Sequence, residues 1–265
     1  MIKVLAILVL YKRGYQQSNS YISLANQNNA PDWFIVDNSP TPQEFPENSK
    51  YLHWPENRGV STAYKEGANW AKINGYTHIL LLDQDTQFIA NAWQVYLDAV
   101  IQQPSYKIYG PKLKCGDKII SPGKRLLGRT FATKFIPDGE VSLNNYSPIN
   151  SGLLIDLEFY QNVGGHEESI PLDFSDFAFL SKVRKFNSQL FVIPTICQHS
   201  LSSATIDSYE TELARFRYYV QGYRAFLKMD GVKASLYFWA LIRMLQLTLR
   251  HKKVGFFVVL FLKKP

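Results

Sequence analysis

The chain has 265 residues, of which 46% are hydrophobic and 19% charged, and this balance excludes a disordered chain and fits a globular one. The formal net charge of +7 is concentrated near the C-terminus, because eleven of the 29 basic residues but only one of the 22 acidic residues lie from Leu213 onward. The remaining body is therefore mildly acidic, which argues against a nucleic-acid groove and predicts a local basic attachment surface.

The N-terminal apolar run Met1–Leu10 is compatible with a secretory signal or with a buried strand. The run is short, contains Lys3, and leads into the bulky, basic Tyr11–Gly14 without a small-residue cleavage site, which favours the strand. The two cysteines, Cys115 and Cys197, stand in no metal-binding or redox spacing, which favours structural thiols in a reducing compartment.

The first hundred residues alternate between strand-like and helix-like segments. Strands are predicted over Lys3–Leu10, Trp33–Val36, Tyr51–Trp54 and His78–Leu82, and helices over Asn19–Asn28, Ser61–Ile73 and Ala92–Gln102. This alternation predicts an α/β fold with a mostly parallel, Rossmann-like sheet and helices on both faces. Ligands of such sheets bind beyond the carboxyl ends of the strands, so functional residues are expected in those loops.

The pattern changes in the second part of the chain. Lys107–Tyr146 contains short strand-like pieces and turns, and we predict an irregular insertion that lines the acceptor side of a site. After it we predict a strand at Ile149–Ile155, a short helix ending at Val163, a helix at Asp173–Phe186 and a strand at Leu190–Ile193. The remainder is helical and basic.

Three aspartates directly follow predicted strands. Asp37 follows Trp33–Val36, and Asp83 and Asp85 follow His78–Leu82. A buried carboxylate at a strand end needs a partner, and there it can bind a ribose hydroxyl, a base N–H group or a divalent cation. Two aspartates two residues apart suit a metal–diphosphate site, because hard cations prefer oxygen ligands. Taken singly, each aspartate is better explained by a capped turn.

Several motifs occur together in a fixed order. They are Val36-Asp37-Asn38-Ser39, Asn57-Arg58-Gly59, Leu81-Leu82-Asp83-Gln84-Asp85, Ile149-Asn150-Ser151-Gly152, Val163-Gly164-Gly165 and Asp173-Phe174-Ser175-Asp176, followed by His199. This series, over residues 3–225, resembles glycosyltransferase family 2, an inverting family of GT-A fold. The Asp-Gln-Asp sequence after apolar residues is similar to the bacterial rhamnosyltransferase branch of that family. Each motif alone is weak, and the resemblance depends on their order and spacing.

The resemblance implies a role for each matching residue. Asp37 would contact the nucleotide base, Asp83 would contact the ribose or base side, and Asn57 and Arg58 would also contact the nucleotide. Asp85 and His199 would be the ligands of Mg²⁺ or Mn²⁺, and Asp176 would be the general base. A solvated surface role for Arg58 and a purely structural role for His199 remain alternatives.

The sequence also departs from the family pattern. The acid that precedes the base in the family is Ser175 here, and Asp173 lies three residues before Asp176, on the same face of a helix. Like charges at that spacing raise one pKa, so Asp173 is an alternative base. Lys65 stands where the family often has an asparagine, and would approach phosphate or point to solvent.

The end of the chain differs from the rest, and we divide the protein into a GT-A domain, residues 1–225, and a helical extension, residues 226–265. No window reaches the ~20 uninterrupted apolar residues of a membrane span. Ala234–Arg250 and Gly255–Leu262 are largely apolar, with basic or polar positions at Arg243, Gln246, Arg250, Lys253 and Lys263-Lys264. We predict a membrane-associating interfacial anchor, with burial against the body or in a dimer as the alternative.

Together these features predict a metal-dependent, inverting glycosyltransferase, cytoplasmic and peripheral on the inner face of a bacterial plasma membrane. The predicted donor is dTDP-rhamnose, with transfer of glucose, galactose or galactofuranose from a UDP-sugar as the alternative. The predicted acceptor is a lipid-linked surface glycan of O-antigen or capsule type. A nucleotidyltransferase is disfavoured, because Tyr11–Gly14 is a poor phosphate-binding loop. A non-catalytic membrane scaffold that retains the fold is a third alternative.

Overall fold

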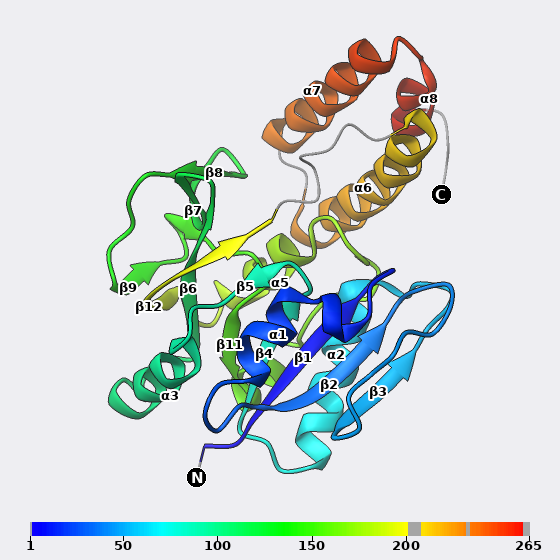
Figure 1. Ribbon diagram of the computed structural model, residues 1–265. Coiled ribbons are helices and arrows are strands. Elements are labelled where there is room, and N and C mark those ends of the chain that lie inside the picture. The colour runs from blue at the N-terminus through cyan, green and yellow to red at the C-terminus, as the bar shows by residue number, and fades with distance from the viewer. Residues whose placement is uncertain (1, 201–207, 232–233, 262–265) are drawn as a thin grey trace.

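The computed structural model describes residues 2–200, 208–231 and 234–261, and every strand in those ranges joins one mixed sheet (Figure 1). The strands are β1 Val4–Leu10, β2 Asp32–Asp37, β3 Ser49–His53, β4 His78–Asp83, β5 Thr86–Gln87, β6 Ile108–Cys115, β7 Lys118–Leu126, β8 Arg129–Thr133, β9 Gly139–Ser142, β10 Tyr146–Ser147, β11 Leu153–Asp156 and β12 Gln189–His199. The helices are η1 Tyr15–Gln17, α1 Asn19–Ala25, α2 Gly59–Ile73, α3 Ala92–Gln102, α4 Leu157–Asn162, α5 Ser175–Val183, α6 Tyr209–Asp230, α7 Ala234–His251 and α8 Gly255–Phe261.

The N-terminal half of the sheet is parallel and Rossmann-like. β3, β2, β1 and β4 lie side by side in that order, with Leu8 of β1 opposite Ile35 of β2 and Leu82 of β4. Every residue of β1 is buried, as expected for a strand that is covered on both faces. Ile7 packs in the core under α2, and Leu8 packs in the core on the opposite face with α1 and α3. The α/β fold predicted from the sequence is confirmed.

The other half of the sheet is largely antiparallel, so the sheet as a whole is mixed. β11 pairs antiparallel with β4 and β6, and β6 pairs antiparallel with β7. The expectation of an irregular insertion over Lys107–Tyr146 is wrong, because this segment supplies β6 to β9. Gly110-Pro111 in β6 and Pro122-Gly123 in β7 interrupt the hydrophobic alternation that marks a strand in a sequence.

β12 is eleven residues long, whereas the sequence predicts only Leu190–Ile193. It pairs in turn with β9, β6 and β5, and its last residue, His199, lies opposite Thr86 of β5. Its register against β6 shifts between Val192 and Ile196, and this irregularity hides the second half of the strand from the sequence pattern. The strand thereby delivers His199 to the loop that follows β4.

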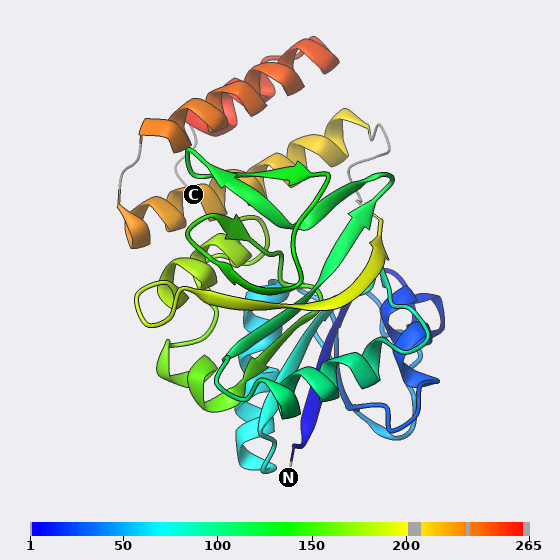
Figure 2. The ribbon, with the colours of Figure 1, turned by 90° about the vertical axis from the view of Figure 1, so that its left-hand side faces the viewer.

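The C-terminal helices form a unit with a core of its own. α6, α7 and α8 pack together and against α5 through a hydrophobic cluster that includes Met244 and Phe256. Residue 225, where we divide the chain, lies inside α6. α7 lies over the β7–β8 hairpin (Figure 2), where Trp239 Nε1 donates a hydrogen bond to Leu127 O at 3.2 Å. Within the described ranges no helix has the length and hydropathy to cross a membrane.

The exposed face of α7 is largely apolar. Arg243 lies over the ring of Tyr219 of α6, 4.8 Å from its centroid, and Arg250 forms a 3.0 Å ion pair with Glu212 of α6. The basic stripe expected along this helix therefore packs toward α6, and Lys263-Lys264 lie outside the described residues. The large hydrophobic residues left exposed on α7 are Tyr237, Phe238, Leu241, Leu245 and Leu249, and Gln246 and Arg250 are exposed as well.

Candidate active site

The carboxyl ends of β1, β2 and β4 meet at one edge of the sheet, where Asp37 organises the loop after β2. Its buried carboxylate accepts hydrogen bonds from Ser39 N at 2.9 Å, Gln43 N at 2.8 Å and the Tyr51 hydroxyl at 2.7 Å. Three donors stabilise a charge that burial alone would make costly, so Asp37 fixes this loop. Burial, together with the bond to Asp37, raises the pKa of Tyr51 to about 12 and keeps its hydroxyl a donor.

An open cavity of about 290 Å³ lies beside this loop. Its lining is formed by Gly14, Gln16, Gln17, Pro42, Gln43 and Glu44. In the same loop Asn38 is 2% exposed, and its Oδ1 has no hydrogen-bond partner among the described residues. An unpaired buried acceptor is costly, so Asn38 is a candidate for contact with a ligand N–H group. No ligand contact is predicted for Asn38 from the sequence.

Asp83 and Asp85 flank the turn that ends β4, in different environments. Asp83 Oδ1 accepts a hydrogen bond from the Tyr64 hydroxyl at 2.7 Å, and its backbone N–H donates to Ser151 Oγ at 3.1 Å. Burial raises the pKa of Asp83, and the bond from Tyr64 acts in the opposite direction. Asp85 is more open, with a side chain 22% exposed, and forms a 3.0 Å ion pair with Arg13.

His199 completes this corner of the site. Its Nδ1 lies 2.8 Å from Thr86 Oγ1, which in turn lies 2.8 Å from Ser151 Oγ. The next residue, Ser200, donates its backbone N–H to Asp85 O at 3.2 Å, so the two predicted metal ligands lie on adjoining strand ends. With its proton on Nδ1, donated to Thr86, the imidazole presents the lone pair of Nε2.

The donor set partly fits a divalent cation. In the part of the chain that the structure describes, no three His, Cys, Asp or Glu side chains are grouped to hold a metal. Asp85 and His199 supply one carboxylate and one imidazole, so a Mg²⁺ or Mn²⁺ ion there needs further oxygen ligands, which a diphosphate offers. The ion would also replace Arg13 as the partner of Asp85.

Asn57 and Arg58 lie in the turn that begins α2, where both have contacts within the protein. Asn57 has a positive φ of 52° and its Oδ1 accepts from Gly59 N at 3.3 Å, while the Arg58 guanidinium lies 4.6 Å from the centroid of the Trp54 ring. Gly59 has φ +84°, and a Cβ there would lie 2.4 Å from Pro171 O. The motif therefore fixes the packing of α2 against the loop before α5.

Asp176 lies in the first turn of α5, at the wall of a cavity of about 390 Å³. Phe174 precedes the helix with a left-handed φ of 71°, a strained conformation of the kind found at functional sites. Asp176 Oδ1 accepts a hydrogen bond from Phe177 N at 2.8 Å. Burial raises the pKa of Asp176 to about 6, and repulsion from Asp173 and Asp83 acts in the same direction. A carboxyl group with this pKa is well suited to accept a proton near neutral pH.

Asp173, the alternative base, lies outside that cavity. Its carboxyl group is close to Arg243 and Arg215, which act against the rise in its pKa caused by burial. Its Oδ2 is buried and has no hydrogen-bond partner among the described residues. α6 packs directly on this residue, since a Cβ on Gly222 would lie 2.2 Å from Asp173 O. The geometry thus brings Asp176, and not Asp173, to the cavity wall.

A buried chain of hydrogen bonds supports the start of α5. The Tyr160 hydroxyl lies 2.9 Å from His166 Nδ1, His166 Nε2 lies 3.0 Å from Asn150 Oδ1, and Asn150 Nδ2 donates to Ser175 Oγ at 3.3 Å. Ser175 Oγ lies 2.7 Å from Ser61 Oγ of α2. Burial lowers the pKa of His166 to about 3, so the ring is neutral. The sequence predicts no role for His166, whereas its partner Asn150 belongs to the Ile149-Asn150-Ser151-Gly152 motif of the family resemblance.

The fold, and not the sequence, relates this chain to known proteins. No protein-family model matches the sequence, and no curated protein matches it either. Comparison with solved structures shows a mixed α/β fold of the GT-A type, with a central sheet and flanking helices. The predicted GT-A architecture is therefore confirmed.

Two solved glycosyltransferases illustrate the likeness. GalNAc-T7, solved with UDP, GalNAc and Mn²⁺, has a TM-score of 0.58 at 12% identity, covering 82% of this chain and 48% of that one. TarS from S. aureus, residues 1–349 in complex with UDP-GlcNAc, has a TM-score of 0.54 at 14% identity, covering 89% of this chain and 69% of that one. This chain spans about half the length of GalNAc-T7 and 41% of a longer TarS structure.

Proposed function

We propose that this protein is an inverting glycosyltransferase of family 2, which transfers a sugar from a nucleoside-diphosphate donor to a hydroxyl group of a glycan. The observation that carries the proposal is the meeting of two acidic centres on a GT-A sheet. Asp83 and Asp85 end β4 with His199 beside them, and Asp176 begins α5 close enough to Asp83 for their charges to repel. The first centre suits a nucleotide diphosphate, and the second suits an attacking hydroxyl group.

On the donor side, we assign the pyrimidine base to the cavity beside the loop that Asp37 organises. The ribose would contact Asp83, and Asn57 and Arg58 would contribute from the turn before α2. The bonds of Asp37 inside the protein favour an indirect role, in which it shapes the loop around the base. Asn38, with its unpaired Oδ1, is the added candidate for a direct contact.

Asp85 and His199 would hold Mg²⁺ or Mn²⁺ next to the diphosphate. When bound, such a cation offsets negative charge on the leaving diphosphate. The presence of Mn²⁺ in the GalNAc-T7 structure supports this assignment. The partial exposure of Asp85 and the place of His199 on the adjoining strand end are the features of this chain that favour it.

On the acceptor side, Asp176 would act as the general base. The acceptor oxygen forms a bond to the anomeric carbon while its proton passes to Asp176, and the bond from that carbon to the diphosphate oxygen breaks on the opposite side. The diphosphate leaves with the electron pair, and one displacement inverts the anomeric centre. A base of this kind contributes ~10²–10⁴-fold to the rate. The place of Asp176 in the cavity wall supports the assignment over Asp173, because burial raises the pKa of both carboxyl groups and only Asp176 lines the cavity.

For the sugar, dTDP-rhamnose is our first proposal, on the resemblance of Leu82-Asp83-Gln84-Asp85 to the rhamnosyltransferase branch. A UDP-sugar carrying glucose, galactose or galactofuranose is the second. The observation that favours the second is that both solved structures compared above contain UDP or a UDP-sugar.

We further propose that the acceptor is a lipid-linked glycan, used at the inner face of a bacterial plasma membrane. The support is the outer face of α7 and α8, where large apolar side chains are exposed beside basic residues, a combination that suits the interface of an anionic membrane. The exposed residues include Phe238, Leu241, Leu245, Leu249, Phe257 and Phe261, with Lys252 and Lys253 between the helices.

The test is release of nucleoside diphosphate by the purified full-length protein. A panel of dTDP-, UDP- and GDP-sugars would be supplied with Mg²⁺ or Mn²⁺ and a detergent-solubilised lipid-linked glycan. We expect release from one donor, abolished by EDTA and reduced at least ~100-fold by Asp176→Asn and by Asp85→Ala. Asp117→Asn, in the exposed β6–β7 turn, is the matched control and should leave release unchanged.

Two results would contradict the proposal. Folded protein that binds no donor in calorimetry and releases no diphosphate is not a glycosyltransferase of this class. Alternatively, Asp85→Ala and Asp176→Ala proteins that still support glycan assembly in cells, while deletion of the tail abolishes it, would identify a non-catalytic membrane scaffold.

A further inference from the structure

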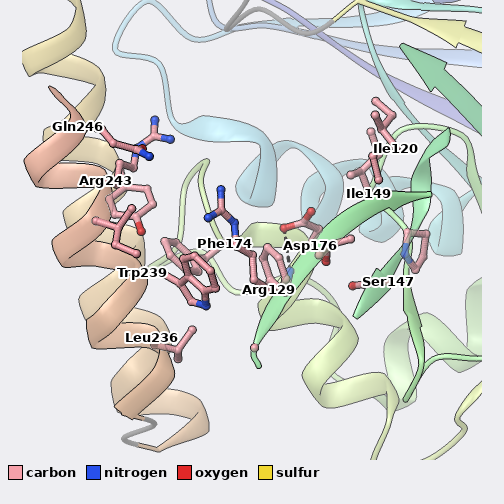
Figure 3. Close-up of a pocket in the computed structure, with 17 residues that line it drawn as sticks. Ile120, Arg129, Ser147, Ile149, Phe174, Asp176, Leu236, Trp239, Arg243 and Gln246 are labelled. Atoms are coloured by element: carbon pink, nitrogen blue, oxygen red, sulfur yellow. Dashed lines mark hydrogen bonds between the residues drawn. The ribbon is translucent and has the colours of Figure 1, made fainter. Parts of the chain in front are cut away.

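A cavity of about 390 Å³ opens beside Asp176, between α5, the β7–β8 hairpin, α6 and α7. Its charged lining comes from Arg129, Arg243 and Asp176, and its aromatic lining comes from Phe174, Phe177, Tyr219 and Trp239. Figure 3 shows Arg243 and Gln246 on α7 at one side and Asp176 at the other. The size lies within the ~300–1,000 Å³ of small-molecule sites.

The two arginines of this cavity are held by aromatic rings instead of carboxylates. Arg129 lies 4.6 Å from the centroid of Trp239, and Arg243 lies 4.8 Å from that of Tyr219. Neither arginine forms an ion pair within residues 2–200, 208–231 and 234–261, and Arg243 Nε is buried with no hydrogen-bond partner there. Asp173 is close to Arg243 but offsets only part of the positive charge, because Arg215 faces it as well.

A guanidinium group that stacks on an aromatic ring can still use its in-plane N–H groups to bind a ligand. Arginine binds phosphate and carboxylate groups through two parallel N–H bonds, and its stacking on a ring fixes the plane of the group. The faces of Trp239 and Phe177 offer a surface on which the C–H face of a sugar ring can lie. The same cavity therefore combines contacts for a sugar ring with contacts for an anion.

We infer that this cavity binds an acceptor sugar that carries a phosphate or carboxylate group, with the anion at Arg129 and Arg243 and a hydroxyl group directed to Asp176. The inference deepens the proposed function and rests on it for the role of Asp176. It also gives α7 a part in acceptor selection. A neutral sugar would desolvate the Arg243 guanidinium and supply no anion beyond the nearby Asp173, which disfavours it as a ligand relative to an anionic sugar.

The test is calorimetric titration of the full-length protein with three kinds of probe. The first is a set of 1-phosphates of glucose, galactose and N-acetylglucosamine; the second is methyl glucuronide; the third is methyl glucoside and inorganic phosphate. We expect at least one anionic sugar to bind about tenfold or more tightly than both probes of the third kind. Arg129→Gln and Arg243→Gln should each weaken that binding about tenfold, whereas Arg217→Gln, exposed on α6, should not.

Three outcomes would overturn the inference: methyl glucoside or inorganic phosphate binding as well as every anionic sugar, binding that both arginine variants retain, or no anionic sugar binding at millimolar concentration. Binding only to the 1-phosphates or only to the glucuronide supports the inference and identifies the anion. Diphosphate release in the presence of the glycan acceptor, measured on the same proteins, separates the two proposals. Release by the wild type with no anion binding rejects the cavity assignment, and anion binding with neither donor binding nor diphosphate release rejects the proposed function.

Discussion

The environment of Asp176 predicts that one substitution will abolish activity and at the same time stabilise the protein. The pKa of this group is about 6, against an ordinary value of 3.8. Between these values the folded state binds more protons than the unfolded state, so raising the pH through this range lowers the stability. The difference between the two pKa values corresponds to a loss of stability at pH 7 of about 3 kcal/mol at most. Because the carboxyl group borders an open cavity, we expect a loss of about 1–2 kcal/mol.

Asp176→Asn should therefore raise the free energy of unfolding at pH 7 by about 1–2 kcal/mol, and this gain should disappear below about pH 4. Asparagine keeps the Oδ1 that accepts from Phe177 N, so no hydrogen bond is lost. Turnover should fall ~10²–10⁴-fold. In the wild type, kcat/KM should decrease tenfold per pH unit below about pH 6, because only about a tenth of the carboxyl groups are ionised at pH 5.

Urea unfolding at pH 4 and pH 7 and initial rates from pH 5 to 8 provide the measurements. Asp117→Asn serves as the control, with neither property changed. A loss of stability in Asp176→Asn at pH 7 would refute the account of its burial and repulsion. An acidic limb of the rate profile that persists in Asp176→Asn would assign the titration to another group.

Three further predictions concern the rest of the molecule. Gly59→Ala should lower the free energy of unfolding, measured in urea, by about 3 kcal/mol, because the new Cβ would meet Pro171 at a positive φ. Gly75→Ala, where no atom lies within 4 Å of the new Cβ, should lower it by about 1 kcal/mol, and equal losses would contradict this reasoning. His166→Ala should cost about 3 kcal/mol and slow turnover with donor affinity unchanged in calorimetry; unchanged turnover would show that the buried chain does not position the base. Leu245→Glu should weaken co-sedimentation with phosphatidylglycerol vesicles about tenfold while leaving the melting temperature unchanged, because the side chain is 53% exposed; vesicle binding equal to wild type would remove the outer face of α7 from membrane contact.

The parallel half of the sheet was predictable because its strands are continuous apolar runs. β1, β2 and β4 match the predicted spans to within a residue, and α3 matches Ala92–Gln102 at both ends. The antiparallel half was not predictable in the same way. β6 and β7 carry glycine and proline, and β11 and β12 pair with strands that are distant in the sequence, so the local pattern does not define the extents of these strands.

The site was predictable only where it depends on strand order. The acids after β2 and β4 meet because parallel strands end at the same edge. The partners of these residues depend on tertiary contacts: Asp37 is saturated by three donors of its own chain, and Lys65, expected near phosphate or solvent, forms a 2.6 Å ion pair with Glu168. The contribution of Arg243 to the cavity was also hidden, because a periodic pattern places it on one face of a helix without showing what that face meets.

The two faces of α7 have a consequence for how this protein can be divided. A shortened chain that stops after α6 would lose Trp239 and Arg243 from the cavity wall and would expose the apolar side of α6, including Phe216 and Phe226. We expect such a truncation to yield an aggregating fragment that lacks the cavity beside Asp176. The 18 residues of this helix therefore carry two proposed roles at once, one for the cavity on the inner face and one for the apolar outer face.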